Sequence, residues 1–146
     1  MGGRGAASGT KYYYDGKVWR KYGDEFETVH TSRNIKFLIN KIGSNTKAPK
    51  ETRTQGRIYV TVNKKENVPQ YITYYDKNGK KFKQIDINQH HRHKIKTKKG
   101  VITLDAKHRH LGYEHAERGS SNLYQRERKI VATVLLEWRK FQRSKK

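Results

Sequence analysis

Apolar and polar residues alternate through the middle of the chain, in the pattern of β-strands that bury one face. In residues 57–62 the apolar side chains Ile58, Val60 and Val62 fall on one side of an extended strand. Residues 71–76 and 81–87 repeat the alternation on either side of Asn78-Gly79, the strongest short signal for a β-hairpin. The pattern therefore predicts a run of antiparallel strands.

Asn78 and Gly79, taken as a two-residue loop, set a definite register for this hairpin. Tyr75 then faces Phe82, Thr73 faces Gln84 and Ile72 faces Ile85. The core face of the two strands collects Ile72, Tyr74, Ile85 and Ile87. The opposite face collects Tyr71, Thr73, Tyr75, Phe82 and Gln84. We expect this second face either to pack under another element or to form an aromatic platform of the kind that stacks bases.

Shorter signals extend the strand pattern in both directions. Asp15-Gly16 is typical of a hairpin turn between aromatic segments, and residues 26–30, 35–39 and 101–104 fit strands. The polar segment 43–54, which contains Pro49, predicts a loop.

The last part of the chain has helical periodicity. At 100° per residue one side collects Ile130, Val131, Val134, Leu135, Trp138 and Phe141, with Leu136 as an exception. Ser121 or Asn122 is suited to cap this helix. We therefore predict an α+β fold, an antiparallel β-sheet meander with a C-terminal amphipathic helix packed on it.

Length and composition limit the organisation of the chain. Its 146 residues predict one domain over 11–146, after a Gly-rich segment 1–10 that we expect to be disordered. There is no cysteine, and no apolar run approaches the ~20 residues of a membrane span. We expect a cytoplasmic protein without membrane contact.

The charge is strongly positive and concentrated in the middle of the chain. Lys and Arg exceed Asp and Glu by 34 to 13, and residues 46–110 contain seventeen of these basic residues against five acidic ones. A field of this strength attracts polyanions, and above all the phosphates of a nucleic acid.

Histidines gather in the same region. Six of the seven lie between Ile85 and His115, in one cluster at residues 90–93, a second at residues 108–110 and a single site at His115. Residues 94–99 between the clusters are rich in lysine. Imidazoles that titrate near neutral pH, set among fixed positive charges, indicate chemistry at a phosphate.

The first hypothesis is RNA cleavage by acid–base chemistry without a metal or other cofactor. One imidazole takes the 2′-hydroxyl proton, a second protonates the leaving oxygen, and cations stabilise the transition state. The pair would be His91 or His93 with His110, brought together if residues 94–100 are a turn between adjacent strands. The candidate catalytic residues are His91, His93, His108, His110, Tyr113 and His115. The candidate nucleic-acid contacts are Arg92, Lys94, Lys96, Lys98, Lys99, Lys107 and Arg109.

Two other interpretations remain open. The protein can bind nucleic acid without cutting it. Alternatively, His108 and His110, two residues apart on one face of a strand, can share a metal ion with Glu114. The sequence lacks a Gly-rich phosphate loop, a nucleophile elbow and the carboxylate cluster of a two-metal nuclease.

Several motifs together resemble a known group of proteins. They are the opening Met-Gly-Gly-Arg-Gly, Gly-Arg-Ile-Tyr-Val-Thr-Val at 56–62, Ile-Thr-Tyr-Tyr-Asp at 72–76, Gln-Ile-Asp-Ile at 84–87, the His-x-His pair, Gly-Tyr-Glu-His at 112–115 and the closing Trp-containing helix. They resemble small proteins of phages and mobile elements of Gram-positive bacteria, over roughly residues 33–140. The histidine-rich part also resembles C-terminal modules of bacterial polymorphic toxins, many of which are ribonucleases.

The resemblance implies functional residues and partners. It carries over to His90 or His91, His108, His110, Tyr113 and His115, although the two clusters lie further apart here and Leu111 stands where a further histidine is expected. It implies an RNA or ribonucleoprotein target in a bacterial host cell. A toxin would have an acidic immunity protein as partner, and an anti-defence protein could act on an RNA-dependent system such as a CRISPR guide.

Overall fold

The computed structural model describes residues 6–7, 12–14, 17–19, 26–41, 48–49, 51–52, 56–87, 94–104, 107–112 and 119–145. The strands are β1 Ala6–Ala7, β2 Tyr12–Tyr14, β3 Lys17–Trp19, β4 Phe26–Ser32, β5 Ile35–Asn40, β6 Glu51–Thr52, β7 Ile58–Asn63, β8 Val68–Tyr75, β9 Lys81–Asp86, β10 Lys94–Thr97, β11 Gly100–Thr103, β12 His108–Leu111 and β13 Ser120–Asn122. The helix α1 spans Gln125–Ser144. Within the described ranges no helix is long and apolar enough to cross a membrane.

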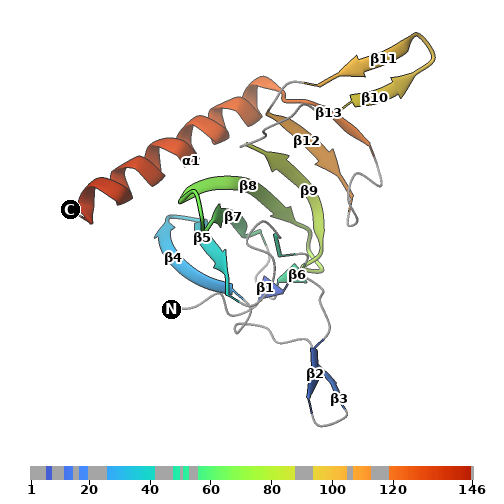
Figure 1. Ribbon diagram of the computed structural model, residues 1–146. Coiled ribbons are helices and arrows are strands. Elements are labelled where there is room, and N and C mark those ends of the chain that lie inside the picture. The colour runs from blue at the N-terminus through green and yellow to red at the C-terminus, as the bar shows by residue number, and fades with distance from the viewer. Residues whose placement is uncertain are drawn as a thin grey trace.

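Seven strands form the main sheet, in the order β13-β12-β9-β8-β7-β5-β4 (Figure 1). Every neighbouring pair is antiparallel except β5 and β7, which are parallel. The predicted α+β class is confirmed, with this one parallel pairing added. It requires a crossover, because parallel neighbours cannot be joined by a tight turn.

The helix covers one face of the sheet and closes the main core. Val131, Val134 and Trp138 from the helix are buried against Ile87 and the strand residues Phe37, Val60, Val62, Ile72 and Ile85. The predicted helix side is confirmed, since Ile130, Leu135 and Phe141 also pack on this core and Leu136 is 48% exposed. Each fully buried side chain of this size contributes ~1.5–3 kcal/mol.

The other face of the sheet carries a smaller apolar cluster of Phe26, Leu38, Tyr59 and Tyr75. The hydroxyl of Tyr75 donates to the carbonyl oxygen of Pro49, and the hydroxyl of Tyr59 lies 2.8 Å from Thr52 Oγ1. Two alternatives were predicted for this face, packing under another element or an aromatic platform. Tyr75 is packed under another element. Burial raises the pKa of the Tyr75 phenol well above its usual value.

The turn at Asn78-Gly79 differs from the prediction by one residue. Asp76 and Lys80 pair by an N–H···O bond of 2.9 Å, so the loop is Lys77–Gly79, with Gly79 at a φ of +79°. A bulge compensates, which places Tyr75 opposite Lys81 rather than Phe82. The predicted pairings of Ile72 with Ile85 and of Thr73 with Gln84 are confirmed.

Gly79 also has a packing reason to be glycine. A Cβ at this position would lie 2.0 Å from the carbonyl oxygen of Thr52, whose own N–H donates to Gly79 O at 2.7 Å. The hairpin turn is thereby tied to β6, which pairs with β1. Ala6 and Ala7 lie opposite Thr52 and Glu51 in this pairing, and the rest of residues 1–10, for which disorder was predicted, lies outside the described residues.

Two further predictions are corrected in the C-terminal half. Residues 94–100 are not simply a turn, because Lys94–Thr97 form strand β10, which pairs with β11 around Lys98-Lys99. The helix N-cap is Tyr124 rather than Ser121 or Asn122, both of which belong to β13. Glu127 Oε1 accepts the Tyr124 N–H at 2.8 Å and supplies the capping contact. The predicted turn at Asp15-Gly16 lies outside the described residues, and on either side of it β2 and β3 pair with Tyr14 opposite Lys17.

Candidate functional site

Strand β12 brings the second histidine cluster onto the main sheet. It pairs with β9 so that His108 lies opposite Asp86 and His110 lies opposite Gln84. Because side chains alternate along a strand, these four share one face, while Arg109 and Ile85 point to the helix side. The His-x-His spacing thus places both imidazoles beside a carboxylate.

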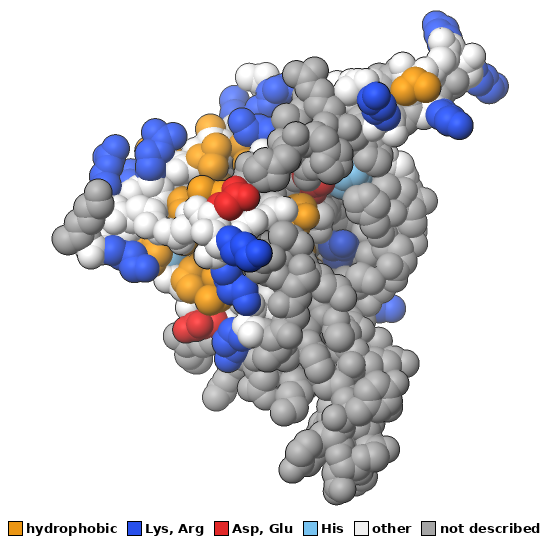
Figure 2. Space-filling view, viewed as in Figure 1, with side chains coloured by type: hydrophobic (Ala, Val, Ile, Leu, Met, Phe, Trp, Pro, Cys, Tyr) orange, Lys and Arg blue, Asp and Glu red, His pale blue; other side chains and the backbone are white. Residues whose placement is uncertain are grey.

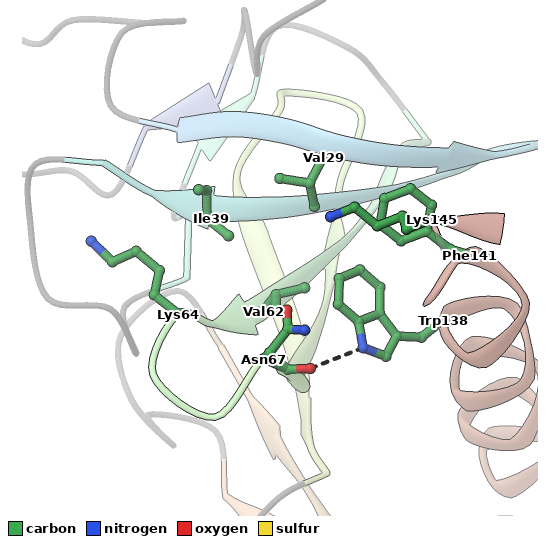
Figure 3. Close-up of a pocket in the computed structure, with 8 residues that line it drawn as sticks. All are labelled: Val29, Ile39, Val62, Lys64, Asn67, Trp138, Phe141 and Lys145. Carbon is green, nitrogen blue, oxygen red and sulfur yellow. Dashed lines mark hydrogen bonds between the residues drawn. The ribbon is translucent and has the colours of Figure 1, made fainter. Parts of the chain in front are cut away.

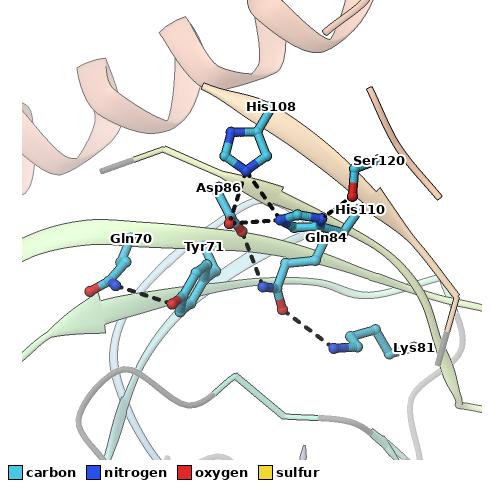
Figure 4. A network of polar contacts seen from close by, with 8 residues as sticks. All are labelled: Gln70, Tyr71, Lys81, Gln84, Asp86, His108, His110 and Ser120. Atoms are coloured by element: carbon cyan, nitrogen blue, oxygen red, sulfur yellow. Dashed lines mark hydrogen bonds and ion pairs between the residues drawn. The ribbon is translucent and has the colours of Figure 1, made fainter. Parts of the chain in front are cut away.

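Asp86, His108 and His110 form a compact buried cluster (Figure 4). The Nε2 atoms of the two histidines are 3.1 Å apart, and Asp86 Oδ2 lies 3.1 Å from His110 Nε2 and 3.5 Å from His108 Nε2. Their relative exposures are 4%, 1% and 4%, respectively. The two imidazole rings are nearly perpendicular, at 89°.

Polar neighbours orient the members of this cluster. Ser120 Oγ lies 2.6 Å from His110 Nδ1, and Gln84 Nε2 donates to Asp86 Oδ1 at 3.1 Å. Lys81 Nζ approaches Gln84 Oε1 at 3.5 Å. On the same face Gln70 Nε2 donates to the Tyr71 hydroxyl at 3.2 Å (Figure 4).

The carboxyl group of Asp86 is held in its charged form. Burial alone raises its pKa, but the hydrogen bonds from His108 and His110, the charge of His110 and the hydrogen bond from Gln84 together outweigh burial. The pKa of Asp86 is therefore well below its usual range. A fixed negative charge among imidazole nitrogens suits either an imidazolium or a metal ion.

Arg109 has a different role from the one predicted. Its Nη1 lies 2.7 Å from Glu127 Oε1, its Nη2 donates to Ser121 Oγ, and its guanidinium stacks 4.0 Å from the centre of the Tyr124 ring. The side chain is 6% exposed. The expected contact with phosphate is not supported, because the guanidinium is used to join β12 to the start of the helix.

Glu127 balances two cations at this junction. Lys83 Nζ lies 3.2 Å from Glu127 Oε2, opposite the contact with Arg109. Burial raises the pKa of Glu127. The hydrogen bonds from the Tyr124 N–H and Lys83 and the charges of Arg109 and Lys83 lower it by more, so the pKa lies below the usual value. The carboxylate therefore stays ionised although it is buried.

The predicted lysines lie apart from this cluster. Lys94, Lys96, Lys98 and Lys99 are exposed on the hairpin β10–β11, and Lys107 is exposed just before β12. The remaining candidates lie outside the described residues; they are His90, His91, Arg92, His93, Tyr113, Glu114 and His115. The acid–base pairing of His91 or His93 with His110 therefore stays a prediction.

His108 and His110 alone do not have the geometry of an RNA-cleaving acid and base. The scissile phosphate has to lie between the two imidazoles, and a 3.1 Å separation of their Nε2 atoms leaves no room for it. The geometry of these two residues is that of ligands to one small cation.

Asp86, Gln84 and Ser120 belong to this cluster but were not predicted from the sequence as parts of the site. Asp86 was detectable as a charged residue between the core residues Ile85 and Ile87, on the polar side of a period-two pattern. The closeness of Asp86 to the histidines was not detectable, because the pairing of β9 with β12 joins segments more than twenty residues apart.

A separate pocket of about 310 Å³ lies between the end of the helix and the sheet (Figure 3). Trp138 and Phe141 form its wall with Val29, Ile39 and Val62, and the Trp138 indole donates to Asn67 O at 3.0 Å. Lys64 and Lys145 also line this pocket. It contains none of the predicted site residues.

Searches of protein-family models, curated proteins and solved structures found no match to this chain.

Proposed function

We propose that the protein binds single-stranded RNA through its basic surface, with the hairpin β10–β11 as the main contact. The observation that carries this proposal is the isolation of the hairpin. Among the described residues, β10 and β11 pair with each other and with no strand of the main sheet. The hairpin projects from the sheet (Figure 1). Four of its lysines are exposed.

The lysines are arranged along both the arm and the tip of the hairpin. Lys94 and Lys96 lie two residues apart on β10, so their side chains share one face at a spacing of ~6.6 Å. Lys98 and Lys99 form the turn. A narrow ribbon with this charge can follow a phosphate backbone, and each neutralised phosphate releases counterions.

The body of the protein extends this positive surface. Figure 2 shows Lys and Arg side chains on the hairpin and along the helix. On the helix the exposed basic residues are Arg126, Arg128, Lys129, Arg139, Lys140 and Arg143. The formal charge of +21 makes long-range attraction of a polyanion strong at low salt.

Exposed aromatic rings favour a single strand over a duplex. Phe82, on β9, is 43% exposed, and Tyr124, the helix N-cap that follows β13, is 54% exposed. Arg126 lies 5.0 Å from the centre of the Tyr124 ring. Aromatic and guanidinium faces stack on unpaired bases, which a duplex does not offer.

A fluorescence-anisotropy titration tests this proposal. The probe is a labelled single-stranded RNA of mixed sequence, titrated at several salt concentrations with the wild type and with Lys96→Glu/Lys98→Glu/Lys99→Glu. The matched control is Lys64→Glu/Lys65→Glu/Lys77→Glu, which changes the net charge equally at exposed positions in the β7–β8 and β8–β9 turns. We expect the hairpin variant to lose at least tenfold more affinity and to lower the salt slope by about 0.7 for each lost contact.

Equal losses in the two variants would show that only the overall charge matters, and binding that is absent or indifferent to salt would overturn the proposal. Tighter binding to duplex DNA than to RNA would overturn the choice of a single strand. Sequencing of RNA recovered with the protein from cells then identifies the target, which the resemblance to phage and toxin proteins suggests is a host RNA or ribonucleoprotein.

A further inference from the structure

Three potential ligand atoms from two neighbouring strands form a small triangle at the buried cluster. The corners are His108 Nε2, His110 Nε2 and Asp86 Oδ2, and the sides measure 3.1, 3.1 and 3.5 Å. The centre of such a triangle lies about 1.9 Å from each corner, close to the ~2.0–2.2 Å of zinc–nitrogen and zinc–oxygen bonds.

Hydrogen bonds alone do not satisfy these three contacts. If both Nε2 atoms carry protons, both can donate to Asp86 Oδ2, but the two N–H groups then lie 3.1 Å apart with no acceptor between them. If only one Nε2 carries a proton, the lone pair of the other Nε2 faces the carboxylate oxygen with no hydrogen between them. A cation at the centre is the arrangement in which all three lone pairs point at positive charge.

We propose that Asp86, His108 and His110 bind one divalent transition-metal ion of the zinc class. Two imidazoles and one carboxylate suit zinc, iron, cobalt or nickel, whereas calcium and magnesium prefer sites made of oxygen ligands. Three protein ligands leave at least one coordination position for water or another group.

The surrounding hydrogen bonds prepare each ligand for this ion. When the His110 Nδ1–H donates a hydrogen bond to Ser120 Oγ, the imidazole keeps a lone pair on Nε2, the atom that faces the cluster. Gln84 donates to Asp86 Oδ1 and leaves Oδ2 directed at the histidines. Such outer contacts fix the tautomer and orientation of ligands in metal sites.

The position of the cluster gives the ion a structural role. Asp86 is the last residue of β9 and His108 is the first residue of β12, and the hairpin β10–β11 lies between them in the chain. An ion shared by these residues cross-links the two strands at the base of the hairpin. Its binding free energy therefore stabilises the end of the sheet from which the hairpin leaves.

Metal content and metal-dependent stability test this proposal without any assay of RNA. Purified protein is dialysed against zinc and then against metal-free buffer, and bound metal is measured by mass spectrometry. The variants are Asp86→Asn, which keeps the size of the side chain, and His108→Ala, with His30→Asn on β4 as the control for loss of an unrelated histidine. A fourth variant changes His90, His91, His93 and His115 together to Asn.

We expect one metal ion per chain in the wild type, in His30→Asn and in the fourfold variant, and less than a tenth of this in Asp86→Asn and His108→Ala. Free zinc at a hundred times its Kd should raise the Tm of the wild type by roughly 8 °C and leave that of Asp86→Asn unchanged. Metal binding that persists in Asp86→Asn, or that disappears in the fourfold variant, would place the ion elsewhere and overturn the proposal.

A measurement on the wild type alone covers the case in which a variant does not fold. X-ray absorption of the cobalt- or zinc-loaded protein should show two imidazole ligands together with oxygen ligands. A wild type that takes up no metal, or a spectrum with only oxygen ligands or with more than two imidazoles, would contradict the assignment.

Discussion

The hairpin β10–β11 and the strand β12 come from one histidine- and lysine-rich stretch, yet they have opposite environments. The hairpin lysines are exposed and the hairpin pairs with no strand of the main sheet among the described residues. Three consecutive residues of β12, namely His108, Arg109 and His110, are at most 6% exposed. Composition alone does not distinguish the two, because both carry basic side chains.

The difference lies in the partners that each segment finds. On one face of β12 the histidines meet Asp86, and on the other Arg109 meets Glu127. Buried charge is tolerated only where an opposite charge and hydrogen bonds compensate the loss of water. The hairpin lysines are exposed to water instead, where lysine side chains can neutralise phosphates. The buried region thus stabilises the sheet, and the exposed region is the one for which we propose RNA binding.

Removal of Glu127 should have the largest effect on this contrast. Glu127→Ala leaves Arg109 and Lys83 buried or partly buried without their carboxylate, and we expect a loss of about 3–5 kcal/mol in the free energy of unfolding. The matched control is Glu137→Ala on the same helix, where the side chain is 26% exposed and pairs with Lys140 at 3.9 Å. We expect the control to lose about 1 kcal/mol or less, measured by urea unfolding. Equal losses would mean that burial of the ion pair is not what stabilises β12.

Acid should weaken the same junction by a smaller amount. Because the pKa of Glu127 is lowered in the folded protein, the unfolded chain binds a proton more readily at acidic pH. The stabilisation is present at neutral pH and is lost as the pH falls below the usual value of 4.5 towards the folded pKa. Urea unfolding of the wild type and Glu127→Gln between pH 7 and pH 3 measures it, and the difference between the two should shrink as the pH falls. A difference that is constant with pH would contradict this.

Changes in β12 should have the smallest effect on RNA binding. His110→Asn removes an imidazole that is 4% exposed, so we expect the RNA affinity of the folded variant to stay within about threefold of the wild type. The same anisotropy titration measures this, and a loss as large as that of the hairpin variant would join the two regions in one binding site. RNA cleavage that persists in EDTA and is abolished by His110→Asn would instead support the acid–base chemistry predicted from the sequence.

Local patterns predicted most of the elements. The helix side through Val131, Val134 and Trp138 follows from periodicity, and Asn78-Gly79 marks the hairpin. The exact loop length did not follow, because a two-residue loop and a three-residue loop with a bulge suit the same Asn-Gly sequence. The histidine spacing placed two imidazoles on one face, but their carboxylate comes from another part of the chain. Long-range strand pairing, which decides that partner, leaves no local signal.

The order of the strands in the sheet has a consequence for synthesis. Phe37, Val60 and Ile72 belong to early strands, but the residues that cover them, Val131, Val134 and Trp138, come about sixty or more residues later. A growing chain therefore carries an apolar sheet face without its helix cover until the helix has left the ribosome. Such a surface is prone to aggregation and is what chaperones bind. The helix is thus the element whose synthesis ends this exposure of the sheet.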